Sequence, residues 1–232
     1  MELADVLSRL ESLGTEQNVR IYRRHGAGDN VYGVSFADLK KLKKQLGVNH
    51  VLALALWDSG NSDARSLAMM IVDPSKVTPA IATKWMKEIS YGLHSGEVAG
   101  VLAHSPCGSS KMRQWRTQKS EYARATGYSI LSHLLKDDAD SVDDMECRRV
   151  LKEVEMEIHR SPNQARHAMV MAVISIGVYK PELRDEAIEA GERIGDVDVD
   201  HGDTSCTTPK IAPYIQKAVK RSQGKSPRVR SC

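Results

Sequence analysis

Apolar residues recur with a helical period along almost the whole of this 232-residue chain. The first segment shows the pattern, because Leu3, Val6, Leu7, Leu10 and Leu13 fall on one face when the chain is wound as an α-helix. No segment shows the strict alternation of apolar and polar residues that is typical of a strand. The periodicity therefore predicts an all-α protein.

Capping residues and glycines divide this pattern into short helices. Thr15, Ser35 and Asn49 stand where a side chain can cap a helix, and Gly47 and Gly60 stand where a helix can end. The predicted helices span residues 3–13, 15–24, 35–46, 50–57, 62–71, 77–89, 96–103, 111–135, 142–159, 162–176, 181–194 and 209–221.

Pairs of these helices recur about every 35 to 45 residues with short turns between them, which favours a stacked array of helical hairpins. A single globular bundle is the alternative, because the repeats share too little sequence for internal identity to decide. In either case we expect one domain over residues 1–221. Residues 222–232 are polar and carry several cations, so we expect a disordered tail there.

Composition restricts the class of protein. Hydrophobic residues make up 41% of the chain but aromatic residues only 5%, so the core must be aliphatic. The acidic, amphipathic N-terminus is unlike a signal peptide, and no apolar run approaches the roughly 18 residues that span a bilayer. The four cysteines are widely separated and lack the spacing of a zinc site. We therefore expect a soluble cytoplasmic protein with no membrane contact, metal or cofactor.

A basic stretch lies between more acidic parts of a chain whose net charge is only +3. Its cations are interleaved with aromatic residues, in the order Lys111, Arg113, Trp115, Arg116, Lys119, Tyr122 and Arg124. Such a mixture is the composition of a surface that holds a phosphate backbone. A solvated helix face with a buried Trp is the alternative, and the stretch alone does not decide between them.

Two features near the C-terminal end have both a functional and a structural interpretation. Arg166 begins a late helix, where it could meet a phosphate at the N-terminal turn or simply lie exposed. Asp200, His201, Asp203 and Cys206 lie close together in sequence, but a zinc site usually needs a second cluster elsewhere. We favour aspartates that cap a turn beside a packed cysteine.

Two motifs in the first third of the chain resemble a known family. Residues 32–42 read Tyr-Gly-Val-Ser-Phe-Ala-Asp-Leu-Lys-Lys-Leu, and residues 54–65 read Leu-Ala-Leu-Trp-Asp-Ser-Gly-Asn-Ser-Asp-Ala-Arg. They are similar to the opening repeats of the DNA alkylation repair glycosylases built from HEAT-like repeats, the AlkD family. The last similar motif is Val-Asp-His-Gly-Asp-Thr-Ser-Cys at residues 199–206, and the similarity covers most of residues 15–221.

The resemblance implies a right-handed α-α superhelix, a HEAT-like repeat solenoid of about six helical hairpins, whose concave basic face grips double-stranded DNA. It also implies release of cationic N3- or N7-alkylated purines. For this chemistry the family uses a carboxylate near the sugar, aromatic side chains around the lesion and an Arg on the adjacent phosphate. No cofactor is implied.

The chain departs from the family's pattern where the catalytic signature should lie. Residues 89–97 supply Tyr91 as the lesion-lining aromatic, but Ser95 stands where the catalytic Asp is expected. Glu97 is the nearest acid and therefore the candidate catalytic residue. Alternatively, it is an ordinary acid near a helix N-terminus. A later Trp-Ala-Leu-Arg element is also replaced, at residues 171–174.

One further family role falls on the basic stretch, because Arg124 corresponds to the phosphate-binding Arg. Together with Tyr91, we expect Ser95 and Trp115 to line the lesion site. We expect additional contacts with DNA phosphates from Lys111, Arg113, Arg116, Lys119 and Arg166.

From these residues we expect a monomeric bacterial protein, cytoplasmic and associated with the nucleoid in use, that binds double-stranded DNA and acts in alkylation repair. Whether it is a DNA N-glycosylase stays open, because the catalytic Asp is missing. The alternatives are a non-catalytic paralogue that binds duplex, damaged or branched DNA, and a solenoid that serves as a protein-binding scaffold.

Overall fold

The computed structural model describes residues 1–221 and residue 229, and every regular element among them is a helix. This confirms the all-α prediction. By its internal contacts the chain divides into two compact units, Met1–Cys107 and Gly108–Cys232. The predicted polar tail lies almost wholly outside the described residues. No helix within the described residues is long and apolar enough to cross a membrane.

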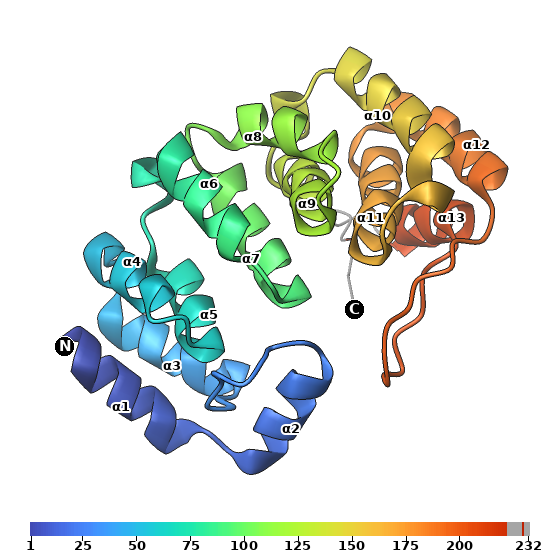
Figure 1. The fold of residues 1–232 in the computed structure, drawn as a ribbon. Helices are drawn as coiled ribbons and strands as arrows, with labels where there is room; N and C mark the ends of the chain where they lie inside the picture. The colour runs from blue at the N-terminus through green and yellow to red at the C-terminus, as the bar shows by residue number, and fades with distance from the viewer. Residues whose placement is uncertain (222–228, 230–232) are drawn as a thin grey trace. The chain divides into compact units, whose positions relative to one another are not determined.

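In the first unit, α5 is the central helix, because α3, α4 and α7 all pack against it (Figure 1). The elements of this unit are α1 (Leu3–Leu13), α2 (Glu16–Arg24), α3 (Phe36–Leu46), α4 (His50–Asp58), α5 (Ser62–Ile71), η1 (Pro74–Lys76), α6 (Pro79–Glu88) and α7 (Gly92–Ala103).

In the second unit, α11 takes the central place. It packs along α9 and carries α12 and α13 on its other sides, and most of its residues are buried, as expected of a helix that is apolar all round. The elements are α8 (Gly108–Arg116), α9 (Glu121–Asp137), η2 (Ala139–Ser141), α10 (Asp144–Glu157), η3 (Ile158–Arg160), α11 (Asn163–Tyr179), η4 (Pro181–Leu183), α12 (Arg184–Ile194) and α13 (Ile211–Arg221).

The helices begin and pack largely as the sequence predicts. Thr15, Ser35 and Asn49 each accept a hydrogen bond from the backbone N–H three residues later, which satisfies a donor that the helix itself leaves unpaired. The core is aliphatic, and Trp57 and Trp85 are the bulky exceptions, with ring centroids 5.5 Å apart.

The predicted single helix over residues 111–135 is wrong, because α8 and α9 are separated by the polar residues 117–120. The apolar period continues across this break, since both helices bury a face in the same core. The two helices approach closely at Gly127, where a Cβ atom would lie only 2.4 Å from the backbone nitrogen of Arg116. The glycine therefore makes the hairpin possible.

The carboxylate of Asp63, in the first turn of α5, holds the backbone of a distant segment. It accepts hydrogen bonds from the N–H groups of Tyr32, Gly33 and Val34 at 2.7, 3.0 and 2.9 Å. Gly33 has φ +81°, and a Cβ atom there would lie 2.5 Å from the carbonyl oxygen of Thr15. Only glycine allows α2 to approach this segment so closely, and Asp63 fixes the segment on which α2 rests.

Replacing Asp63 with Ala should lower the free energy of unfolding by about 2 to 4 kcal/mol, because three N–H groups lose a charged acceptor. Asp58→Ala is the matched control, since its carboxylate pairs with Lys84 at the surface and such a pair contributes at most about 1 kcal/mol. Urea denaturation followed by circular dichroism measures both variants. Equal losses of stability would contradict the role given to Asp63.

Candidate functional site

The start of α7 carries an aromatic cluster, formed by Tyr91, His94 and Trp57. Tyr91 is the N-cap residue of α7 and is 9% exposed. The ring of His94 lies edge-on to that of Tyr91, with centroids 5.1 Å apart, and 6.0 Å from the ring of Trp57 on α4. Because α7 begins at Gly92 rather than at residue 96, Tyr91 and His94 share one helical turn.

His94 is fixed in one protonation state by its surroundings. Its Nε2 lies 3.1 Å from the carbonyl oxygen of Ser62, while its Nδ1 is buried and has no partner among the described residues. A carbonyl oxygen can only accept, so Nε2 carries the proton and Nδ1 presents a lone pair. Burial lowers the pKa of His94 to about 4, and the ring is therefore neutral near pH 7. Sequence reasoning missed this residue, although its spacing of three from Tyr91 was an available signal.

Glu97 turns its carboxylate toward α5. Its Oε2 accepts a hydrogen bond from the hydroxyl of Ser66 at 3.0 Å, while Oε1 is buried without a partner among the described residues. Although other parts of the residue keep some exposure, burial of the carboxylate raises the pKa of Glu97 to about 7. The side chain is therefore a buried acid that changes charge near neutral pH.

The predicted residues of α7 lie in one region. Burial, followed by the charge of Glu97, raises the pKa of Tyr91 to about 12, so its phenol stays protonated. Ser95 is only 4% exposed and does not replace the missing Asp with an acidic group. The arrangement thus combines a buried carboxyl group, a phenol and a neutral imidazole beside an aromatic surface.

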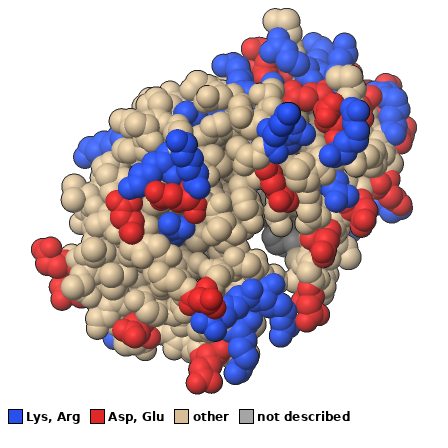
Figure 2. Space-filling view, in the orientation of Figure 1, with Lys and Arg blue, Asp and Glu red and all other residues tan. Residues whose placement is uncertain are grey.

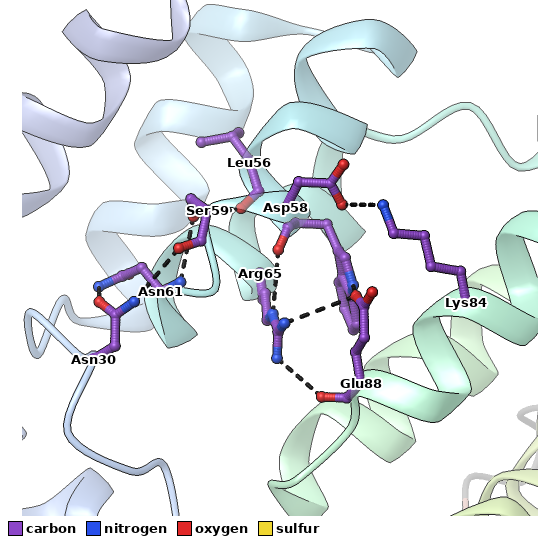
Figure 3. A network of polar contacts seen from close by, with 9 residues as sticks. Asn30, Leu56, Asp58, Ser59, Asn61, Arg65, Lys84 and Glu88 are labelled. Carbon is purple, nitrogen blue, oxygen red and sulfur yellow. Dashed lines mark hydrogen bonds and ion pairs between the residues drawn. The ribbon is translucent and has the colours of Figure 1, made fainter.

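A polar network around Arg65 and Glu88 fixes the Trp57 side of the aromatic cluster. The guanidinium of Arg65 on α5 donates to the carbonyl oxygen of Glu88 (Figure 3) and to that of Trp57. It also lies 4.8 Å from the centroid of the Trp57 ring. The indole N–H of Trp57 donates to Oε2 of Glu88 at 2.6 Å. These contacts tie α4, α5 and the end of α6 together, and they fix the ring on which His94 packs.

In the second unit, three residues of the basic stretch are buried. Lys111, Trp115 and Arg116 are 8%, 4% and 3% exposed. Nζ of Lys111 lies 5.3 Å from the centroid of the Trp115 ring and donates to the side chain of Gln114. The ring of Trp115 packs inside the unit, so the predicted contact with a lesion would require the ring to become exposed. Lys111 and Arg116 are buried as well, so the phosphate contacts predicted for them would also require a rearrangement of the unit.

Arg116 belongs to an internal ion-pair network. Its guanidinium pairs with Glu146, which is itself 3% exposed, and lies 3.4 Å from Oε2 of Glu153. Glu146 also pairs with Arg149, and Glu153 accepts the hydroxyl of Tyr128 at 2.6 Å. Arg116 and Glu146 are thus buried as a pair, and removal of either one would leave an uncompensated buried charge.

The other cations of the stretch are accessible. Arg113 and Lys119 are exposed, and neither forms an ion pair with a residue that the structure describes. Arg124 donates from Nε to the carbonyl oxygen of Gln118 at 2.9 Å and from Nη1 to Ser161 at 3.0 Å. These bonds hold the guanidinium in one orientation and leave Nη2 for a further acceptor.

Hydrogen bonds join Arg166, near the start of α11, to the segment around Asp200. Arg166 donates to the carbonyl oxygen of Asp198, and Asn163 and Asp200 exchange hydrogen bonds of 2.7 Å in both directions. His201 lies 3.0 Å from the hydroxyl of Thr208. Within the described part of the chain, no group of three or more His, Cys, Asp and Glu residues is placed to hold a metal ion. These contacts fasten a loop to the start of α11.

The raised pKa of Glu97 predicts a specific dependence of stability on pH. The native state keeps the proton up to about pH 7, whereas the unfolded chain releases it near the ordinary value of 4.5. The native state therefore binds more protons between these values, and this group makes stability fall as pH rises through them. The stability of wild type relative to Glu97→Gln should drop by about 3 kcal/mol from pH 4 to pH 8. Denaturant unfolding at several pH values measures this, and a constant difference would contradict it.

The buried network around Arg116 predicts a loss of stability of about 3 to 5 kcal/mol for Arg116→Ala, because Glu146 would remain buried without its partner. Arg113→Ala, a change of the same type at an exposed position of the same helix, should shift stability by less than about 0.5 kcal/mol. Thermal and urea unfolding of the two variants measure the contrast. Similar stabilities would show that the pairing of Arg116 contributes little.

Comparison with known proteins places the chain in a family. The sequence profile of the family described as DNA alkylation repair enzyme matches residues 6–208. An uncharacterized protein of Listeria innocua is 29% identical over 225 residues, which cover 92% of this chain and 96% of the relative. An uncharacterized protein of Listeria monocytogenes is 27% identical, with coverage of 93% and 96%.

A solved structure shares the fold along its whole length. It comes from a family of proteins described as related to the HEAT-like repeat DNA glycosylases, with affinity for branched DNA structures. The two chains match over 100% of both lengths, with a TM-score of 0.90 and 26% identity, which confirms the expected HEAT-like repeat fold. Since the family profile spans most of the sequence, this protein belongs to the DNA alkylation repair enzyme family.

Proposed function

We propose that this protein binds DNA through the backbone phosphates and that it prefers branched DNA. The observation that carries the proposal is the likeness, over the full length of both chains, to a protein for which affinity for branched DNA is described. Membership of the DNA alkylation repair family supports the same class of ligand. Phosphate contacts from Lys and Arg supply most of the affinity of such complexes.

The cations that flank the turn between α8 and α9 support this proposal. We call Arg113, Lys119 and Arg124 the α8–α9 patch. Arg113 and Lys119 are exposed and have no ion-pair partner among the described residues, so a phosphate would not have to displace an acid. Arg124 is held in place by Gln118 and Ser161, and a guanidinium oriented in advance loses less entropy on binding.

Base excision is a second candidate function, and Glu97 is the observation that favours it. Its buried Oε1 has no partner among the described residues, and the protonated phenol of Tyr91 lies nearby. An ionised carboxylate could stabilise the positive charge that develops on the sugar as a cationic alkylpurine leaves. With a pKa of about 7, Glu97 would supply that charge above neutral pH, and excision would increase as the pH rises through 7.

Binding is tested with a fluorescent four-way DNA junction and a linear duplex of the same sequence. The triple variant Arg113→Gln, Lys119→Gln and Arg124→Gln should bind the junction at least about tenfold more weakly and lower the slope of log K against log salt by about 2 to 3. The control Lys136→Gln, Lys152→Gln and Lys217→Gln removes the same charge from exposed positions of the same unit. Equal effects of the two variants would contradict the assignment of the patch.

Excision is tested by release of free base from duplex DNA that contains 7-methylguanine. Release that falls sharply in Glu97→Gln, but not in the exposed-site control Glu192→Gln, would support the second candidate. No release by the wild-type protein, together with salt-sensitive binding of the junction, would leave the binding function alone.

A further inference from the structure

Helix α2 carries exposed charged side chains and contributes no buried residue to the core. Arg20, Arg23 and Arg24 are spaced at i, i+3 and i+4 and are all exposed, so they share one face; we call them the α2 patch. In the orientation of Figure 1, Figure 2 shows Lys and Arg side chains gathered over α2. A helix of nine residues is marginal in isolation, so other contacts must hold it.

The contacts that hold α2 are polar, and they lie on its other face. Asn18 donates to the carbonyl oxygen of Gly33 at 3.0 Å, and the hydroxyl of Tyr22 donates to that of Val34 at 2.9 Å. The accepting segment is the one fixed by Asp63. An open hollow of about 440 Å³, lined in part by Glu11 and Val19, lies between α1 and α2. The helix is thus mounted on a rigid support with its basic face outward.

The end of α2 adjoins the aromatic cluster. Gly26, two residues beyond the last residue of α2, lies against Tyr91, because a Cβ atom there would be 4.0 Å from Cδ2 of the Tyr91 ring. The hydroxyl of Ser62 on α5 donates to the carbonyl oxygen of Ala27 at 2.9 Å and fixes the same loop. Within the first unit, the C-terminal end of α2 and the loop that follows it therefore lie next to the candidate site.

The acids beside Arg20 and Arg23 pair with these two arginines only at the exposed surface. Arg20 lies 3.8 Å from Glu16 and Arg23 lies 3.7 Å from Asp29, and in both pairs the carboxylate is more than nine-tenths exposed. Exposed pairs of this kind contribute little and are screened by salt. A phosphate group, which can accept from a guanidinium at two oxygens, would compete with them effectively.

We propose that the α2 patch is a second phosphate-binding surface, which holds the DNA backbone beside Tyr91. The inference rests on the proposed function, since DNA must be the ligand. A purely structural explanation covers only part of the patch. Arg23 and Arg24 lie in the last turn, where cations stabilise the helix dipole, but Arg20 lies a turn earlier. The two explanations differ in their consequence, because a dipole effect changes stability and not affinity for DNA.

The test compares three triple variants in the junction and duplex binding assay over about 50 to 200 mM salt. Arg20→Gln, Arg23→Gln and Arg24→Gln should weaken junction binding at least about tenfold and reduce the salt slope by about 2 to 3. The matched control is Lys40→Gln, Lys43→Gln and Lys44→Gln, which removes the same charge from exposed positions of α3 and should leave both values near those of wild type. Replacement of the three arginines by Lys keeps the charge and should retain most of the salt slope.

The outcomes separate this inference from the proposed function. If the wild-type protein shows no salt-sensitive binding to either DNA, both are overturned. If the wild type binds and the α2 variant binds equally well, or if the α2 and α3 variants lose affinity equally, only the inference about α2 is overturned. Circular dichroism melting of each variant identifies a loss of affinity that results from unfolding, and the Lys variant then decides the result.

Discussion

One turn of α5 holds several segments of the first unit in place through polar contacts. The three hydrogen bonds that Asp63 accepts are the first of these contacts. Within five residues, α5 directs Asp63 to the segment under α2, Arg65 to Trp57 and Glu88, and Ser66 to Glu97. The carbonyl oxygen of Ser62 also fixes the ring of His94. A helix that is central in packing is therefore central in polar contacts as well, and a charged side chain that binds backbone N–H groups is strong enough to serve as the anchor.

Much of the fold could be predicted, because the signals for it are local. Thr15, Ser35 and Asn49 cap helices by bonding only three residues ahead, and an aliphatic period marks each buried face. The break between α8 and α9 escaped prediction because both helices bury the same kind of face, so the period passes through the turn unchanged. The polar residues 117–120 mark the break only weakly, and the close packing at Gly127 becomes evident only with the partner helix in place.

The candidate site was predicted less completely, because its chemistry depends on partners far along the chain. Arg116 and Arg113 look alike in sequence, yet Glu146 makes the first an internal residue. Likewise, the pKa of Glu97 depends on burial against α5, which no local pattern reports. Tyr91 could be named from a motif, whereas His94 gains its significance only when Ser62 and Trp57 surround it.

The manner in which α2 is attached has a consequence for motion. Its side-chain hydrogen bonds to Gly33 and Val34 are only partly buried, and no side chain of the helix is buried in the core. Opening this helix therefore exposes little apolar surface and costs far less than opening α5. We expect the backbone amide hydrogens of α2 to exchange with solvent through local unfolding. Those of α5 should exchange only when the whole unit unfolds. The first unit thus contains a helix, α5, that opens only with the whole unit and a helix, α2, that opens locally.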